Sequence, residues 1–399
     1  MDHQASRRMR RGLWIAMLIV LLPPATTAQE LDLGGFIKSE YIYDTRQVTQ
    51  IREGQFHLFP LARADEDQDG LDDNATDNLL FAAFQSRLRL QGSGAQALGA
   101  QLTGLLEADF FGAINEDVSE LRLRHAFVQL DWQRHQLLLG QYWSPLFTTA
   151  VFPQVINFNT GAPFQPFARF PQLRYTFKPN RVRVMAVLSQ QRDAFQEIGG
   201  RKLQQQSALP AAHLHVQYVH EAHTVGAGGY LKTIRPNLNE DRFTAGTLQA
   251  YAKTSALGTV LRAKVTYGND LTDHLMTGGF VQTEAGTYEA LRVVGTWVDA
   301  ETTGQPLSVG LFGGYLTNLG CRKDVTVVST NARAPDLEKL WRLAPRLSYT
   351  VGKLRLALEV EATRALYAGS YDTTFRPTCT ETDRAVTNVR GLFAAYYFF

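Results

Sequence analysis

The last twelve residues of the chain, NVRGLFAAYYFF at positions 388–399, alternate between two faces. One face carries Val389, Gly391, Phe393, Ala395, Tyr397 and Phe399, and the other carries Asn388, Arg390, Leu392, Ala394, Tyr396 and Phe398. A period of two residues is that of a β-strand. An uncovered strand this apolar would pair with other chains. We therefore expect a neighbouring strand to close it in, with its aromatic end facing lipid.

The first 28 residues have the three-part layout of a secretory signal peptide. Four arginines between positions 7 and 11 precede an apolar stretch at 13–22, and small residues follow up to Ala28. The alternative, a membrane anchor, needs about 17 to 25 apolar residues, more than this stretch contains. We therefore expect cleavage after Ala28.

Removing this segment changes the charge of the chain. The whole sequence of 399 residues has 40 basic and 38 acidic side chains, a net charge of +2. The 371 residues that remain have 36 basic and 37 acidic side chains, a net charge of −1.

No later apolar run reaches the 18 or so residues of a spanning helix. An exported chain of this kind is either a soluble protein outside the cytoplasm or a membrane barrel.

Stretches of about ten residues with alternating character recur along the mature chain. In AQLTGLLEADFF (100–111) and VGKLRLALEVEAT (351–363), one face suits lipid and the other suits water. Sixteen such stretches lie near 33–43, 80–92, 98–110, 121–131, 136–143, 172–178, 181–190, 212–220, 224–234, 243–254, 259–269, 288–299, 306–316, 340–351, 353–364 and 386–399. The pattern predicts an all-β fold, a 16-stranded antiparallel transmembrane β-barrel of the bacterial outer membrane. A soluble sandwich is the alternative.

Short and long breaks alternate between these stretches. The short ones, such as GSGAQ (92–96), KPNR (178–181) and VGK (351–353), are expected to be periplasmic turns. The long ones are expected to be extracellular loops, among them an acidic loop at 44–79. Residues 29–399 would thus form one barrel domain.

Basic residues recur on the face opposite the lipid-facing one. They are Arg87, Arg89, Arg122, Arg124, Arg174 and Arg183, with the acids Glu107 and Asp109 on the same face. Guanidinium groups pair with planar carboxylates or phosphates, so a row of them in a water-filled lumen would favour anions. The alternative is that these arginines only pair with lumen acids and brace the wall.

The segment 144–171 is too long for a hairpin and too apolar for an exposed loop. It holds six phenylalanines and five prolines, which predicts a stiff segment that folds into the lumen and narrows it. Its polar residues Asn157, Asn159, Gln165 and Arg169 are then candidates for the constriction. Packing across the mouth, or at a subunit contact, is the alternative.

The first long loop contains DEDQDGLDD (65–73). Carboxylates at alternate positions followed by Gly70 are typical of a calcium loop, with Asp65, Asp67, Asp69 and Asp73 as candidate ligands. The glutamate expected at the twelfth position is Thr76 here, and an ordinary solvated acidic loop is an equal alternative. No other cofactor is expected.

Two cysteines, Cys321 and Cys379, suit one disulfide in an oxidising compartment. Two separate thiols, or a bond between chains, are the alternatives.

Four motifs resemble the DcaP-like outer-membrane porins: FAAFQSRLRLQ (81–91), LRLRHAFVQLD (121–131), LLLGQYWSPLF (137–147) and FARFPQLRYTF (167–177). The resemblance covers roughly residues 33–190. It implies a sixteen-stranded, trimeric porin with an inward-folding loop, through which small and often anionic solutes such as dicarboxylates diffuse. Arg87, Arg89, Arg122, Arg124 and Arg174 would line its pore.

The predicted function is passive diffusion of small hydrophilic, preferentially anionic solutes such as carboxylates, by a homotrimer in outer-membrane lipid. Adhesion or a purely structural role is the alternative, and a membrane hydrolase is a weaker one. Ser144 could be combined with His125 or His135, but no nucleophile motif supports this. The chain shows no patch for nucleic acid, and no enzyme activity is expected.

Overall fold

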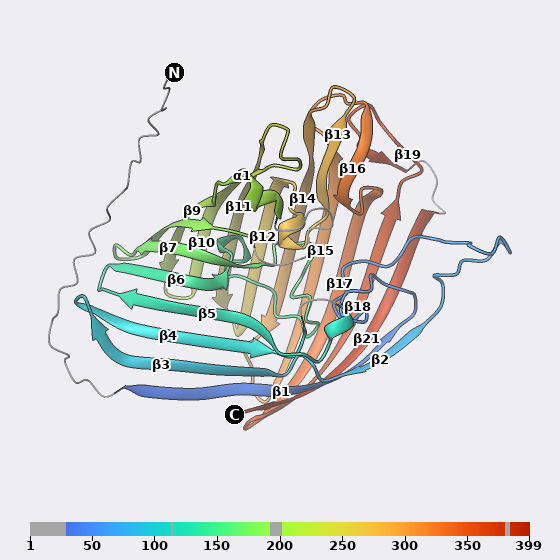
Figure 1. Ribbon diagram of the computed structural model, residues 1–399. Coiled ribbons are helices and arrows are strands. Elements are labelled where there is room, and N and C mark those ends of the chain that lie inside the picture. Colours follow the sequence, from blue (N-terminus) through green and yellow to red (C-terminus); the bar gives the residue numbers. More distant parts are fainter. Residues whose placement is uncertain (1–28, 113–114, 192–201, 380–383) are drawn as a thin grey trace, which may run out of the picture.

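Sixteen antiparallel strands close into a barrel in the computed structural model (Figure 1). The structure describes residues 29–112, 115–191, 202–379 and 384–399. The barrel strands are β1 (Glu30–Asp44), β2 (Asn78–Ala82) continued by β3 (Arg87–Ala97), β4 (Ala100–Asp109), β5 (Arg122–Asp131), β6 (His135–Trp143), β7 (Arg169–Phe177), β8 (Val182–Ser189), β9 (Ala211–His220), β10 (His223–Ile234), β11 (Phe243–Ala256), β12 (Thr259–Asn269), β14 (Tyr288–Thr302), β15 (Leu307–Gly320), β17 (Leu337–Val351), β18 (Leu354–Tyr367) and β21 (Ala385–Phe398). Each of the sixteen predicted stretches coincides with one of them, so the predicted fold class is confirmed. The predicted signal peptide lies outside the described residues.

The terminal strand closes the barrel. β21 pairs with β1 from Phe36 opposite Phe398 to Asp44 opposite Arg390, and its other edge pairs with β18. The backbones of Gly35 and Phe399 exchange two hydrogen bonds, of 3.3 and 3.2 Å. This pairing removes the free edge of an apolar strand, as the sequence predicted.

The aromatic end of β21 divides between the two faces. Tyr397 and Phe399 face outward and are 50% and 37% exposed. Tyr396 and Phe398 face inward and pack on Phe36, with ring centroids 5.8 and 5.9 Å from it. The outward pair lies where the sequence predicted a lipid contact.

Deleting Phe399 is expected to impair assembly of the barrel in the membrane. The deletion removes both backbone hydrogen bonds to Gly35 and the last outward aromatic ring, so the seam between β1 and β21 would open at its end. The fraction of folded barrel is measured by the heat-dependent shift of its gel mobility. Phe399→Tyr, which keeps the backbone and the ring, is the control. Normal folding of the deletion variant would contradict the role of this residue.

The two faces of each strand differ as a membrane barrel requires. On β18, Leu354, Leu358 and Val360 face outward and are about half exposed, whereas Glu359 and Glu361 face inward and are buried. Apolar outward and polar inward residues are the pattern of transmembrane barrels. No helix in the described part of the chain is long and apolar enough to span a membrane.

The short turns lie at one end of the barrel and the long loops at the other. Most turns fall where the sequence predicted, but GSGAQ does not form one. These residues stay in β3, with a register shift between Gly92 and Ala95, and the turn is formed by Leu98 and Gly99. Both have positive φ, 53° and 72°, as two-residue hairpin turns require.

The wall of the barrel is uneven in height (Figure 1). Strands β6 to β8 have 8 or 9 residues, whereas β14, β15, β17, β18 and β21 have 14 or 15. We call β14, β15, β17, β18 and β21 the tall wall. Two further strands, β13 (Gly278–Thr283) and β16 (Val327–Arg333), pair with each other beyond it. The remaining elements are β19 (Ser370–Tyr371), β20 (Pro377–Thr378), α1 (Lys202–Ser207), η1 (Asn115–Asp117), η2 (Pro145–Phe147) and η3 (Thr272–His274). The short wall, β3 to β9, carries two cavities on its inner face.

Candidate functional site

Two adjoining cavities lie on the inner face of the short wall. The first, which we call the Arg174 cavity, has a volume of about 320 Å³, and the second, the Arg89 cavity, about 500 Å³. Phe127, Gln129, Tyr142 and Trp143 line both, so the two cavities adjoin along β5 and β6.

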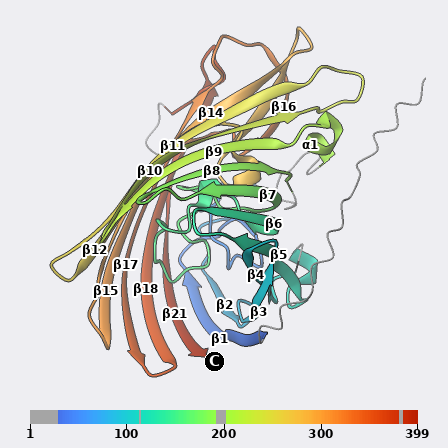
Figure 2. The same cartoon turned by 90° about the vertical axis from the view of Figure 1, so that its left-hand side faces the viewer.

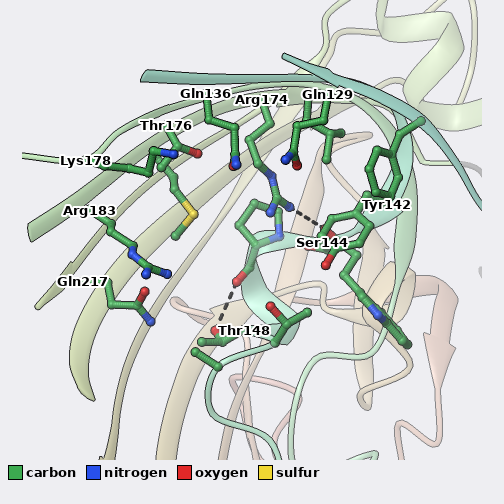
Figure 3. Close-up of a pocket in the computed structure, with 17 residues that line it drawn as sticks. Gln129, Gln136, Tyr142, Ser144, Thr148, Arg174, Thr176, Lys178, Arg183 and Gln217 are labelled. Carbon is green, nitrogen blue, oxygen red and sulfur yellow. Dashed lines mark hydrogen bonds between the residues drawn. The ribbon is translucent and has the colours of Figure 1, made fainter. Parts of the chain in front are cut away.

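Basic side chains dominate the Arg174 cavity. Figure 3 shows Arg174, Lys178 and Arg183 directed into it beside amide and hydroxyl groups, and no carboxylate lines it. Arg174 donates to the backbone carbonyl of Trp143 at 2.6 Å, which fixes its position. Lys178 pairs with Asp131 at 2.7 Å, whereas Arg183 has no acidic partner among the described residues. The cavity therefore has an excess of positive charge.

The Arg89 cavity is also basic, but part of its charge is neutralised. Arg87, Arg89 and Arg124 line it together with one carboxylate, Glu107. Arg124 lies 2.7 Å from both Glu107 and Asp109. Arg89 donates to the amide oxygen of Gln91, forms no ion pair with a described residue, and lies opposite Glu107 in the strand register.

Two residues predicted to line the pore line neither cavity. Arg122 forms an ion pair with Asp109 at 3.0 Å, and Asp109 is fully buried. Arg122 and Asp109 face each other across β4 and β5, so they brace the wall. Close opposite charges on adjacent strands satisfy one another, as in the alternative that these arginines pair with lumen acids. The pore-lining role of this pair stays a prediction.

The predicted inward-folding segment lies inside the barrel (Figure 2). Residues 144–168 are mostly buried, and Phe147, Phe158, Phe164 and Phe167 belong to one apolar cluster with wall residues such as Phe312. We call this cluster the plug. The segment ends where β7 begins at Arg169, slightly earlier than predicted.

The tall wall holds this segment through buried carboxylates. Glu359 accepts the backbone N–H groups of Ile156 and Asn157 at 2.7 and 3.0 Å. Glu361 accepts the side-chain amides of Asn157 and Asn159 and forms an ion pair with Arg342 at 3.3 Å. This part of the segment is therefore fixed to β17 and β18, whereas its beginning, at Ser144 to Ala150, lines the Arg174 cavity.

A lysine and a glutamine anchor the beginning of the same segment. Lys264 Nζ donates to the carbonyls of Leu146 and Phe147 at 3.0 Å each, and Gln249 donates to Thr148 Oγ1 at 2.9 Å. Both come from the inner face of β11 and β12. The segment thus spans the lumen between two walls.

The four predicted constriction residues line neither cavity. Asn157, Asn159, Gln165 and Arg169 are all at most 2% exposed. Asn157 and Asn159 bind Glu361, Gln165 donates to the carbonyl of Thr160, and Arg169 lies over the Trp143 ring at 4.8 Å. Buried carboxylates need donors, which explains why Asn157 and Asn159 face the wall. The segment residues that do line the Arg174 cavity are Ser144, Pro145, Thr148, Thr149 and Ala150.

Part of the predicted extracellular loop 44–79 also folds into the barrel, which the sequence analysis missed. Phe56 and Leu58 join the plug, and Arg390 donates to the carbonyls of Gly54 and Gln55. His57 bonds to Glu361, and burial lowers the pKa of His57 to about 4, so it is neutral at pH 7. The apolar pattern of residues 56–60, FHLFP, was the available signal.

A third segment, 270–277, completes the plug with Leu271, Leu275 and Met276. Its Asp273 accepts from Lys232 Nζ at 2.9 Å and from Tyr230 at 2.7 Å. The backbone N–H of Phe167 donates to the carbonyl of His274 at 2.8 Å. Two segments far apart in the sequence are thus joined inside the lumen.

Ser144 lies against His274 instead of His125 or His135. The distance between Ser144 Oγ and His274 Nε2 is 2.9 Å, and both side chains are buried. His125 lies 3.7 Å from Glu107, and His135 bonds to Tyr175 at 2.6 Å. His274 Nδ1 in turn lies 3.0 Å from Asp273 Oδ1, and the Asp273 carboxylate also accepts from Lys232 and Tyr230. These contacts join the beginning of the segment 144–168 to the segment 270–277.

Three of the four predicted calcium ligands gather in the first loop. Asp65, Asp67 and Asp69 are exposed, and one carboxylate oxygen from each lies within 4.8 Å of the others. Asp73 is separate and accepts the backbone N–H of Glu66 at 2.8 Å.

The described residues Cys321 and Cys379 are not joined by a disulfide, so the predicted bridge is absent from the structure. Cys321 is buried in an apolar cluster with Leu291 and Val281. Burial raises the pKa of the Cys321 thiol to about 11, so it is protonated at neutral pH. The backbone N–H of Cys379 is held separately by Glu338 at 2.9 Å.

No family model matches the chain, and no curated protein sequence matches it either. Among solved structures, the chain is similar to the outer membrane channel DcaP of Acinetobacter baumannii, with a TM-score of 0.72 and 18% identity, over 93% of this chain and 98% of that one. It is also similar to an anion-selective porin from Comamonas acidovorans (TM-score 0.59, 10% identity, 93% and 100% of the two chains). OmpF of Salmonella typhi has a TM-score of 0.56 and 12% identity over 92% and 97%. The predicted resemblance is confirmed at the level of the fold: the chain has the sixteen-stranded barrel fold of these outer-membrane channels.

Proposed function

We propose that this barrel is an outer-membrane channel for passive diffusion of small hydrophilic solutes, with a preference for anions such as carboxylates. The charge of the two cavities carries the proposal. Six basic side chains line them, Arg87, Arg89, Arg124, Arg174, Lys178 and Arg183, against the single carboxylate of Glu107. Rings or rows of basic groups in a pore select anions.

The other lining groups suit a solute that bears a carboxylate. Guanidinium groups hold carboxylates through two parallel hydrogen bonds. The amides of Gln129, Gln136 and Gln217 add further donors around the Arg174 cavity (Figure 3). Because both cavities lie on the inner face of the short wall, a solute that passes through them would meet these basic groups.

The test is a planar-bilayer recording of the purified barrel under a salt gradient. We expect stepwise open-channel currents and a reversal potential of the sign that indicates anion selectivity. Addition of a small dicarboxylate should reduce the chloride current by competition. A folded barrel without conductance would contradict the channel, and cation selectivity would contradict the anion preference.

The uneven wall supports a homotrimer in which the short wall faces the other subunits. The short strands β6 to β8 leave a low edge, and OmpT of Vibrio cholerae, similar in fold (TM-score 0.55, 11% identity, 93% and 100% of the chains), has been solved in a trimer form. The mass of the barrel in detergent, from light scattering, would decide this.

Calcium binding by Asp65, Asp67 and Asp69 is proposed as a structural feature of the first loop. Three clustered carboxylates repel one another without a cation, so calcium should order residues 62–77. We expect calcium to slow proteolysis of this loop, and a chelator to restore it. Asp67→Asn with Asp69→Asn should remove the calcium effect, whereas Asp77→Asn should keep it. Equal rates of cleavage with and without calcium would contradict calcium binding and indicate an ordinary acidic loop.

A further inference from the structure

A groove of about 520 Å³ lies on the outer face of the barrel across β9 to β12. Its walls are Leu214, Leu231 and Leu248, which point outward and are 59%, 58% and 66% exposed. Gly229 and Gly246 form its floor, because they place no side chain at outward positions of β10 and β11. A Cβ atom at Gly246 would lie 3.2 Å from Leu231 Cδ2. The groove therefore depends on these two glycines.

One end of the groove is basic, unlike its walls. Arg292 and Arg322 line it there, and we name the whole feature the Arg322 groove. Arg292 donates to the carbonyls of Leu319, Gly320 and Cys321 at 2.9, 3.2 and 2.6 Å, which fixes its guanidinium at the rim. Arg322 is exposed and forms no ion pair with a described residue. Nearby Glu289 pairs with Lys323 at 2.6 Å.

The basic end lies at the long-loop side of the barrel. Leu214 is near the start of β9, Leu231 near the end of β10, and Arg292 opposite Asn269, the last residue of β12. Long loops are extracellular in barrels of this class. The groove thus lies at the depth of the outer leaflet, with its arginines at the level of lipid headgroups.

We propose that the Arg322 groove binds a phosphorylated lipid of the outer leaflet. An acyl chain lies over Gly229 and Gly246 between the three leucines, and a headgroup phosphate is held by Arg292 and Arg322. Guanidinium and phosphate form paired, charge-assisted hydrogen bonds. An apolar groove that ends in two arginines matches both parts of such a molecule. The trimer proposed above places the short wall, β3 to β9, against the other subunits, so β10 to β12, with most of the groove, face lipid.

Native mass spectrometry of the full barrel in a nonionic detergent tests this proposal. The probe is lipid A, an acylated glucosamine disaccharide with two phosphates, and the comparison is the same disaccharide without phosphates. We expect lipid A to bind at least fivefold more tightly. Arg322→Ala should remove most of this difference, and Gly246→Leu should weaken binding of both lipids.

Arg134→Ala, the same change in a turn at the opposite end of the barrel, is the matched control and should leave binding unchanged. Equal binding of the two lipids, or wild-type binding by both variants, would overturn the proposal. So would a loss of subunit association in Gly246→Leu with no change in lipid binding, since the groove would then hold another subunit.

Discussion

Replacing Arg174 and Arg183 together by glutamine is expected to remove most of the anion preference of the channel. Both side chains reach into the Arg174 cavity, and no carboxylate lines it. A unit charge about 7 Å from a passing anion contributes about 0.6 kcal/mol even in bulk water. Two such charges would favour an anion in the cavity by roughly sevenfold and disfavour a cation by about the same factor, somewhat less at high salt because of screening.

The measurement is the reversal potential in a salt gradient, with unitary conductance recorded alongside. Arg174→Lys with Arg183→Lys keeps the charge and should keep most of the selectivity. Arg134→Gln with Lys353→Gln removes two exposed charges from the short turns and should change little. Unchanged selectivity in the Arg174 and Arg183 variant would show that the ions do not pass through this cavity.

Replacing Glu361 by alanine is expected to release the inner segments from the wall. This buried carboxylate bonds to Asn157, Asn159 and His57 and forms an ion pair with Arg342. Its removal leaves the Arg342 guanidinium buried without its nearest acid. Breaking a buried pair in this way costs about 3–5 kcal/mol.

We expect a lower melting temperature and a larger, noisier single-channel conductance, because the plug would no longer be held to β17 and β18. Melting is followed by the heat-dependent gel shift, and conductance in a planar bilayer. Glu221→Ala, in an exposed turn, is the matched control. A variant with wild-type melting and conductance would show that Glu361 does not hold the segments.

The strand pattern was predictable because it depends on a local rule. Outward residues must be apolar and inward residues polar, so a period of two can be recognised in each strand without knowledge of its neighbours. The misplaced turn at GSGAQ shows the limit of this rule. Glycines within β3 tolerate a shifted register, whereas the true turn at Leu98 and Gly99 depends on backbone conformation that composition does not reveal.

The roles of individual arginines depended on partners far away in the sequence. Arg174 and Arg183 line the Arg174 cavity, whereas Arg122 forms an ion pair with Asp109, thirteen residues away on the adjacent strand. Likewise, Asn157 and Asn159 turn toward Glu361, about two hundred residues later. The alternation of the two faces indicates which side chains point inward. It does not indicate which side chain each of them pairs with.

The sequence by itself determined the barrel, its sixteen strands, the basic inner face and the presence of an inward segment. Each of these follows from local alternation, composition or an apolar excess between strands. Only the tertiary structure decided that the segments around Phe56, Phe158 and Leu275 meet in one plug, and that Glu359 and Glu361 of β18 hold two of these segments. The reason is physical: the buried carboxylates of Glu359 and Glu361 must find donors inside the lumen, and only the closed barrel brings those donors within reach.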